Sequence, residues 1–171
     1  MTCQERHRKV PLFLFPALAK SGKSEYTISD IIRLQKEDFP MILIGTKCQL
    51  EQTVTEELTA AAVGSGLLNV FGTPYMIGLM ENAAQTALQN FLEEGQGSVG
   101  THLDIQHTAP TPVGMKVFVE AEIVSVSENG KMVDFQVKAW DEKGPIGQGT
   151  HTRAIINNER FLSKCNAKLD K

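Results

Sequence analysis

The sequence has no apolar run that approaches the roughly 20 residues of a membrane-spanning helix. It also carries little net charge, −3 at pH 7, so no strong positive field would draw it to nucleic acid or to an anionic membrane. The 171 residues are 42% hydrophobic and 22% charged, which is ordinary for a folded domain. These values predict one globular domain with its own core, and neither a nucleic-acid partner nor a membrane partner.

Cysteine and metal-binding motifs are scarce. The three cysteines, Cys3, Cys48 and Cys165, lie far apart and show no CxxC spacing, which indicates reduced thiols and favours the cytoplasm. The four histidines form no HExxH motif, so their spacing proposes no metal site. The SGKS at residues 21–24 lacks the upstream glycine of a phosphate-binding loop, because position 17 is Ala17. We therefore expect neither a metal nor a resident cofactor.

The first 40 residues read differently from the rest. Basic residues precede an apolar stretch near the start, as in a secretory signal, but Pro11 and Pro16 interrupt that stretch. Residues 27–38 have the spacing of a short helix. We interpret residues 1–40 as a weakly structured extension or the product of a misassigned start codon, and residues 41–171 as the domain.

The domain changes from a helical to a β pattern along its length. Residues 42–54 predict a first strand, and residues 74–92 place apolar side chains at helical spacing over five turns. Residues 98–156 alternate in several strands, with Asn129-Gly130 as a tight hairpin turn. The order predicts an α+β fold in which one long helix lies along a curved antiparallel sheet.

One helix covers only one face of such a sheet. The other face or an edge strand would need a partner. We therefore expect a homodimer, with further pairing into a tetramer left open.

Two polar residues of the predicted helix are candidates for chemistry. Thr73 sits at the expected N-cap before Pro74, where the helix dipole stabilises negative charge, although it can equally act as a cap alone. Glu81 lies at the edge of the apolar arc, where a carboxylate suits acid–base work, although a solvated edge glutamate is the simpler reading. The two are slightly more than two turns apart and can approach one pocket.

Two residues of the β region complete the set of polar candidates. His107 lies near a strand end, where a histidine is usually a surface or core residue. Gly100, seven residues earlier, allows a ligand to approach its backbone N–H closely.

Three segments together resemble a known family. TEELTAAAVGSGLLNVFGTPYMIGLMENAA, SVGTHLDIQHTAPTPVGMKVFVEAEI and GQGTHTRAII are similar to the hotdog-fold thioesterases related to fluoroacetyl-CoA thioesterase, and the resemblance covers about residues 42–162. It implies a dimeric hotdog fold that hydrolyses a short or small acyl-CoA thioester, with coenzyme A present only as part of the substrate.

The resemblance also implies roles for individual residues. Its catalytic threonine, glutamate and histidine match Thr73, Glu81 and His107, and its oxyanion-binding backbone amide falls at Gly100. Three residues near the site could line an acyl pocket or simply pack in the core: Phe71, Tyr75 and Met76.

Some alternatives remain open at this stage. Glu81 can activate water or attack directly, and Arg153 can approach the CoA phosphates or pair within the sheet. Other functions also stay possible on this scaffold: a hotdog hydratase or dehydratase, and a non-catalytic acyl-CoA binding or sensing protein.

Overall fold

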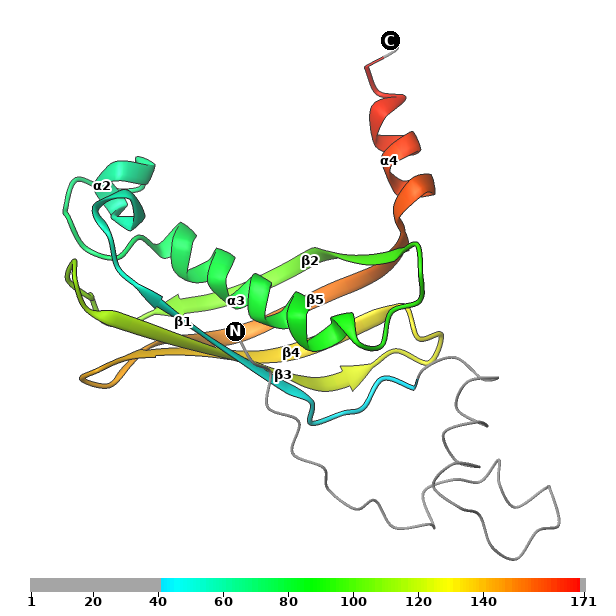
Figure 1. Cartoon of the computed structure of the whole chain (residues 1–171), viewed down its shortest axis with the longest axis horizontal. Coiled ribbons are helices and arrows are strands. Elements are labelled where there is room, and N and C mark those ends of the chain that lie inside the picture. The colour runs from blue at the N-terminus through cyan, green and yellow to red at the C-terminus, as the bar shows by residue number, and fades with distance from the viewer. Residues whose placement is uncertain (1–40, 170–171) are drawn as a thin grey trace, which may run out of the picture.

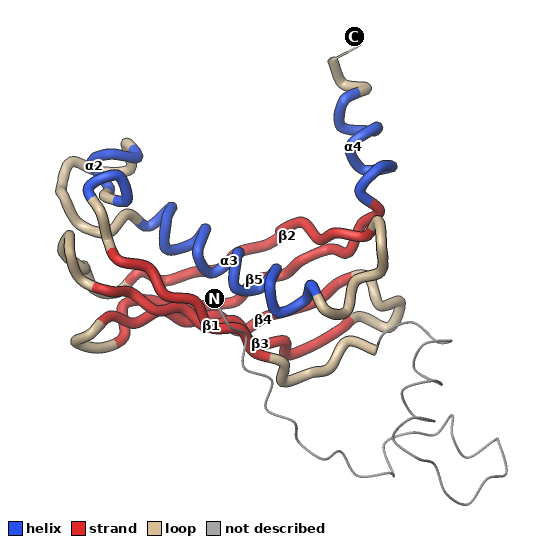
Figure 2. Tube along the Cα trace, in the orientation of Figure 1, coloured by secondary structure: helices blue, strands red, loops and turns tan. Residues whose placement is uncertain are grey.

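The domain is built on one antiparallel sheet. The computed structural model describes residues 41–169, so the predictions made for residues 1–40 lie outside the described residues. The sheet has the strand order β1-β3-β4-β5-β2, and every neighbouring pair is antiparallel (Figures 1 and 2). Its strands are β1 (Lys47–Thr53), β2 (Gln96–His107), β3 (Lys116–Val126), β4 (Met132–Asp141) and β5 (Pro145–Asn157).

The long helix α3 (Thr73–Gln89) lies along one face of this sheet (Figure 1). Its buried side includes three alanines, which let the helix backbone approach the strands closely. The opposing side chains come from the alternate, inward-facing positions of β3 and β4. Each large apolar side chain buried here contributes about 1.5–3 kcal/mol. The fully buried set is Met76, Met80, Ala83, Ala84, Ala87, Leu88, Val117, Val119, Ala121, Ile123, Val133, Phe135, Val137 and Ala139.

Three short helical segments lie outside this core. The 3-10 turn η3 (Glu56–Leu58) and α2 (Ala60–Val63) precede α3, and α4 (Asn158–Asn166) follows β5. Thr59 caps α2 by accepting a hydrogen bond from the backbone of Ala62. α4 was not expected from the sequence; Asn157 caps it by accepting the N–H of Arg160, and none of its residues is buried.

A buried hydrogen bond joins two turns at one end of the sheet. The Thr111 hydroxyl donates to the Asp141 carboxylate at 2.8 Å, and the backbone N–H groups of Lys143 and Gly144 donate to the other oxygen. These donors hold the pKa of Asp141 below its ordinary value against the opposing effect of burial. The Thr111–Asp141 hydrogen bond ties the loop that follows His107 to the turn between β4 and β5.

The predicted architecture is confirmed. An antiparallel sheet with one long helix along its face is the hotdog fold. The Asn129-Gly130 turn joins β3 to β4, and Gly130 adopts a positive φ of 67° that favours glycine. Among the residues that the structure describes, no helix has the length and apolar character needed to cross a membrane.

Candidate active site

Thr73 and His107 form a direct hydrogen-bonded pair. Thr73 is the first residue of α3 and His107 is the last residue of β2. Thr73 Oγ1 lies 2.8 Å from His107 Nδ1. The expectation that Thr73 caps α3 is wrong, because Gly72 occupies the cap position and no side chain caps the helix. The hydroxyl is therefore available to the imidazole, in the geometry that lets a histidine exchange a proton with a hydroxyl group.

Burial shapes the chemistry of His107. It lowers the pKa of the ring, so that the neutral form dominates at neutral pH. Its Nε2 atom is buried and has no hydrogen-bond partner among the described residues. A neutral ring with one hydrogen-bonded and one unpaired nitrogen can receive a proton at one nitrogen and release one from the other.

A hollow of about 280 Å³ lies beside this pair. Phe71, predicted to contact an acyl group, is among its lining residues and is 2% exposed. Tyr75 packs against the core and Met76 is fully buried within it. Neither Tyr75 nor Met76 lines the hollow, and their predicted role in acyl binding stays a prediction. The lining residues are Ala60, Ser65, Val70, Phe71, Thr73, His107, Thr108, Ala109 and Pro110.

Glu81 belongs to a second group of polar residues. Its Oε1 atom lies 3.8 Å from His151 Nε2 and 3.9 Å from Arg153 Nη1. The structure brings Glu81 to Gly100 as well, because a methyl group on Gly100 would overlap Oε1 and press on the His151 ring. In the part of the chain that the structure describes, no hydrogen bond joins Glu81 to Thr73 or His107. The predicted residues thus lie in two neighbouring pairs.

Arg153 is held firmly at this second group. It is 6% exposed, and its Nε and Nη2 atoms donate to the hydroxyl and the backbone carbonyl of Ser98 at 2.9 and 2.8 Å. Its Nη1 atom donates to the backbone carbonyl of Glu81 at 3.4 Å. The sequence left the role of Arg153 open; the structure places it within the sheet as the partner of Glu81.

His151 is the residue that sequence reasoning missed. It is fully buried, and its Nδ1 atom lies 2.9 Å from the backbone carbonyl of His102. Because a carbonyl only accepts, Nδ1 carries the proton, and Nε2 accepts from Arg153 Nη1 at 3.3 Å. Burial is the main cause that lowers the pKa of His151, so the ring is neutral at neutral pH. The signal was present: two residues with basic side chains, His151 and Arg153, lie two positions apart on the inward face of one strand.

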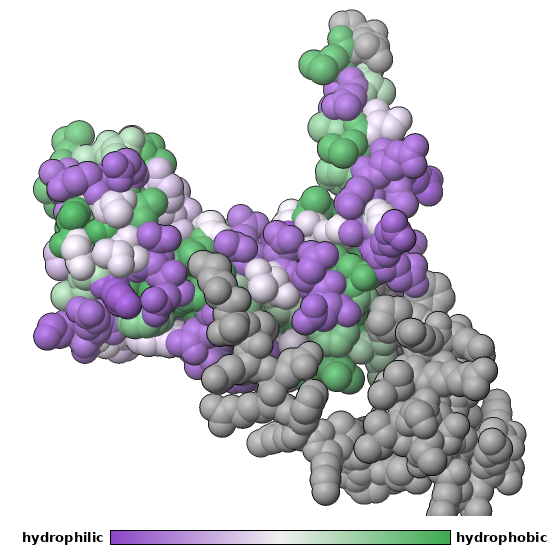
Figure 3. All heavy atoms as spheres, in the orientation of Figure 1, coloured by the Kyte–Doolittle hydropathy of each residue, from purple (hydrophilic) through white to green (hydrophobic). Residues whose placement is uncertain are grey.

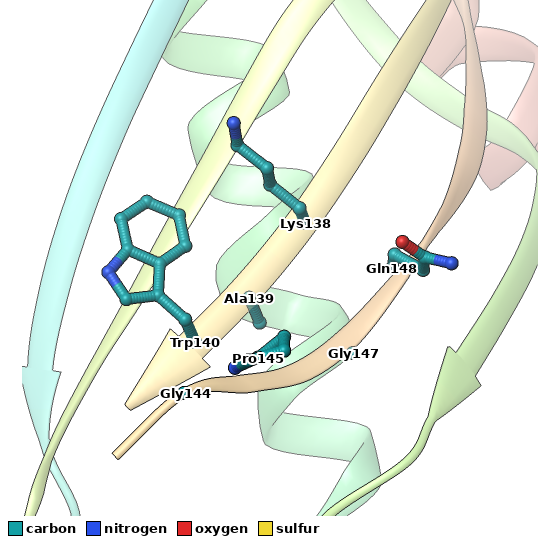
Figure 4. Close-up of a pocket in the computed structure, with 7 residues that line it drawn as sticks. All are labelled: Lys138, Ala139, Trp140, Gly144, Pro145, Gly147 and Gln148. Carbon is teal, nitrogen blue, oxygen red and sulfur yellow. The ribbon is translucent and has the colours of Figure 1, made fainter. Parts of the chain in front are cut away.

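A larger hollow on the opposite face of the sheet holds none of the predicted residues. It measures about 420 Å³, and Figure 4 shows Lys138 and Trp140 on the side away from α3. Lys138 Nζ lies 2.9 Å from Glu120 Oε1, and the Trp140 ring stacks on Phe118. The ammonium group of Lys138 and the ring of Trp140 are thus engaged in contacts within the sheet. The predicted site residues all lie on the other face, beside α3.

Comparison with known proteins identifies the class. The model of the fluoroacetyl-CoA-specific thioesterase family matches residues 54–159. A fluoroacetyl-CoA thioesterase from Streptantibioticus cattleyicolor is 46% identical over 99 residues, which cover 58% of this chain and 70% of that protein. The fold and the family match are those of a hotdog-fold thioesterase.

Solved structures give the same result. A structure of the fluoroacetyl-CoA thioesterase FlK superposes with a TM-score of 0.71 at 36% identity, covering 75% of this chain and 98% of that one. A Thermus thermophilus protein described as a thioesterase superfamily member gives 0.70 at 28% identity, covering 76% and 95%. The chain belongs to the fluoroacetyl-CoA-specific thioesterase family.

Proposed function

We propose that this protein hydrolyses the thioester of a small acyl-CoA to the free acid and coenzyme A, with Thr73, Glu81 and His107 as the catalytic residues. Coenzyme A enters as part of the substrate, and the side chains of the protein carry the reaction without a metal or cofactor. The observation that carries the proposal is the Thr73–His107 hydrogen bond, which lies beside a hollow sized for a small group. The same helix, α3, also carries the Glu81 carboxylate, which pairs with Arg153.

The size of the hollow supports a small acyl group. Ligand pockets commonly span about 300–1,000 Å³. At about 280 Å³, the hollow beside Thr73 is slightly smaller than this range. The relative from Streptantibioticus cattleyicolor acts, by its name, on fluoroacetyl-CoA, which is such a substrate. A short acyl chain therefore fits both the space and the relationship.

The positions along α3 suggest where the thioester lies. Glu81 is eight residues after Thr73, a rise of about 12 Å along the helix axis. Side chains on a helix tilt toward its N-terminus, so the carboxylate of Glu81 leans toward Thr73. We place the thioester carbon between the two groups, with Glu81 on one side and the Thr73–His107 pair on the other.

Each group then has a chemical task. Glu81, positioned beside Arg153, removes a proton from the attacking water, or attacks the carbonyl itself to form an anhydride that water then hydrolyses. Thr73 orients the reacting oxygen, and neutral His107 takes up the proton released from the attacking water, through the Thr73 hydroxyl, as it passes a proton to the departing thiolate, so the ring ends neutral. The backbone N–H of Gly100 stabilises the oxyanion, a contribution typically worth about 100- to 1,000-fold in rate.

The edge strand β2 supports a homodimer. It is 12 residues long, lies at one edge of the sheet, and most of its central residues are exposed in the single chain. A long exposed edge strand presents unpaired backbone groups that pair readily with another strand. We propose that two copies of β2 pair antiparallel about a two-fold axis, which joins the two sheets.

The exposed thiol of Cys165 suits the reducing cytoplasm, where we place the protein.

A thiol-release assay tests the function. Substrates run from acetyl-CoA and fluoroacetyl-CoA to aromatic acyl-CoA esters, and the products are identified by mass. Free acid and CoA in equal amounts are expected with at least one small substrate. A product with altered unsaturation and an intact thioester would instead show a hydratase or dehydratase. Saturable binding of every ester without turnover would show a binding protein, and either result would contradict the proposal.

A further inference from the structure

The C-terminal helix α4 carries an apolar face that no other segment among residues 41–169 covers. The helix projects from the body of the domain, as Figure 1 shows. On α4, Phe161 and Leu162 are 42% and 57% exposed, and Leu169, in the turn that follows the helix, is 85% exposed. Cys165 lies on the same side of the helix and is also exposed. Large apolar side chains gathered on one exposed helix face mark a surface that binds another protein.

A second exposed apolar surface lies at the other end of β2. It belongs to residues 55–69, which contain η3 and α2 and are called the α2 lobe below. Leu67 is 96% exposed, Leu68 is 69% exposed and Val63 is 39% exposed. Figure 3 shows hydrophobic residues at the surface of both the α2 lobe and α4. The chain thus presents two apolar surfaces, one at each end of the same edge strand.

The positions of these surfaces relate them to a two-fold axis. α4 begins beside the start of β2, where the backbone N–H of Asn158 donates to the carbonyl of Gly95 at 2.9 Å. The α2 lobe lies at the end of β2, where it lines the same hollow as His107. Antiparallel pairing of two β2 strands over most of their length sets the start of one strand beside the end of the other. Both surfaces also project past β2 in the same direction (Figure 1).

We propose that α4 of each protomer packs its apolar face on the α2 lobe of the partner protomer. The inference rests on the β2 dimer proposed above and adds a second contact to it. Each dimer then contains two such contacts, related by the two-fold axis.

Charge favours the same pairing. The α2 lobe carries Glu56 and Glu57 and no basic residue. From Asn158 to Leu169, three basic residues outnumber the single acid Glu159: Arg160 and Lys164 lie one helical turn apart on α4, and Lys168 follows in the turn after the helix. An acidic lobe facing a basic helix is complementary, whereas two lobes or two α4 helices would repel each other.

The contact would also complete the site. Ala60 and Ser65 of the α2 lobe form one wall of the hollow beside Thr73 and His107. Within one chain the outer side of that wall is exposed, as Leu67 shows. The partner's α4 would cover the outer side and hold the wall in place. We therefore expect disruption of α4 to weaken substrate binding more than the chemical step.

The native Cys165 allows a direct test in the full chain. In a Cys3→Ser background, Val63→Cys, Leu67→Cys and Leu68→Cys are made one at a time and oxidised mildly. A covalent dimer on a non-reducing gel is expected for at least one of them, because a disulfide requires Cα atoms within about 7 Å. The covalent dimer must disappear in Cys165→Ser. Glu128→Cys, equally exposed but on the β3–β4 hairpin, must give none.

Light scattering of the same samples separates the possible failures. A dimer in which none of the three lobe cysteines cross-links would mean that another segment or protein covers α4, and would overturn this inference while leaving the β2 dimer. A monomer would overturn both. Thiol release, measured separately, reports on the proposed hydrolysis whichever of these results is obtained.

A kinetic variant gives an independent readout. Leu162→Glu places a charge on the apolar face of α4, far from the catalytic residues of its own chain. We expect KM to rise roughly five- to tenfold, equivalent to about 1–1.4 kcal/mol of binding, with kcat within twofold. Val124→Glu is the matched control, because Val124 is 42% exposed on the outer sheet face. Equal KM values for the two variants would overturn the contribution of α4 to the site.

Discussion

Gly100 and Glu81 lie against each other with no room for a side-chain carbon between them. A Cβ at residue 100 would overlap Oε1 of Glu81 and lie 3.0 Å from Cε1 of His151. β2 has an irregularity in its pairing with β5 between Gly100 and His102, at the point where the carboxylate approaches. A side chain at residue 100 would therefore have to displace the Glu81 carboxylate from the place it occupies against the backbone.

Gly100→Ala tests this relationship. The methyl group must displace the Glu81 carboxylate, and a displacement of about 1 Å in an active site can cost about 100-fold in rate. We expect kcat to fall by about that factor while the far-ultraviolet circular dichroism is unchanged. Gly78→Ala on α3 is the control, because an added Cβ there meets nothing within 4 Å. A Gly100→Ala enzyme with full activity would refute the assignment of Glu81 and Gly100 to one site.

Thr73→Val removes the hydroxyl and keeps the shape of the side chain. The hydrogen bond to His107 Nδ1 is lost, and with it the proton exchange of the pair. General acid–base contributions of this kind are typically about 100- to 10,000-fold. We expect kcat to fall at least 100-fold in Thr73→Val and much less in Thr73→Ser. Thiol release under saturating substrate measures both, and equal rates for the two variants would rule out a role for the hydroxyl.

The buried histidines predict how stability depends on pH. Burial lowers the pKa of both His107 and His151 in the folded state below the ordinary value of 6.5. The unfolded chain therefore binds more protons below pH 6.5, and the free energy of unfolding decreases as the pH falls from 6.5 toward each folded-state pKa. Each histidine contributes a slope of at most about 1.4 kcal/mol per pH unit.

His151→Asn isolates one part of this effect. Asparagine can still donate to the His102 carbonyl but does not titrate. Urea unfolding between pH 5 and 7.5 is expected to show a shallower slope in the variant. The carboxylates of Glu120, Asp134 and Asp141 have lowered pKa values and lose their contributions only at more acidic pH. An unchanged slope would mean that His151 does not titrate in this range.

Arg153→Lys tests the partner of Glu81. The guanidinium donates to Ser98 Oγ, Ser98 O and Glu81 O from three different nitrogen atoms, and an ammonium group does not reproduce that fork. We expect kcat to fall at least about tenfold, since the carboxylate loses its fixed partner. Ser98→Ala, which removes only one of the three acceptors, should fall less. Wild-type kcat in Arg153→Lys would show that Glu81 is positioned by other contacts.

Much of the fold followed from local patterns. The helix at residues 74–92 and its apolar face needed only the helical spacing, and the structure places it at Thr73–Gln89. Asn129-Gly130 marked its hairpin because few residues tolerate the required backbone angles. α4 was missed because its apolar residues stay exposed among the described residues, so its sequence resembles an exposed tail.

The site could be predicted only in part. Thr73, Glu81, His107 and Gly100 were found from their positions and the family resemblance, but their division into two pairs depends on contacts between distant strands and α3. His151 depends on tertiary structure in the same way, because its partner is the carbonyl of His102, 49 residues earlier. Alternation along β5 indicated which face His151 occupies, but the approach of Glu81 to it is set by the packing of α3 on the sheet.

The most direct test of the account is the turnover of Glu81→Gln, measured by thiol release with the best small acyl-CoA ester. Glutamine keeps the size of the side chain but removes the charge that Arg153 pairs with and the base that the reaction uses. Glu93→Gln, an exposed change just after α3, serves as the control. The account predicts that Glu93→Gln keeps full activity while Glu81→Gln loses at least about 100-fold in kcat. Full turnover in Glu81→Gln would contradict it, because the thioester would then be cleaved without this carboxylate.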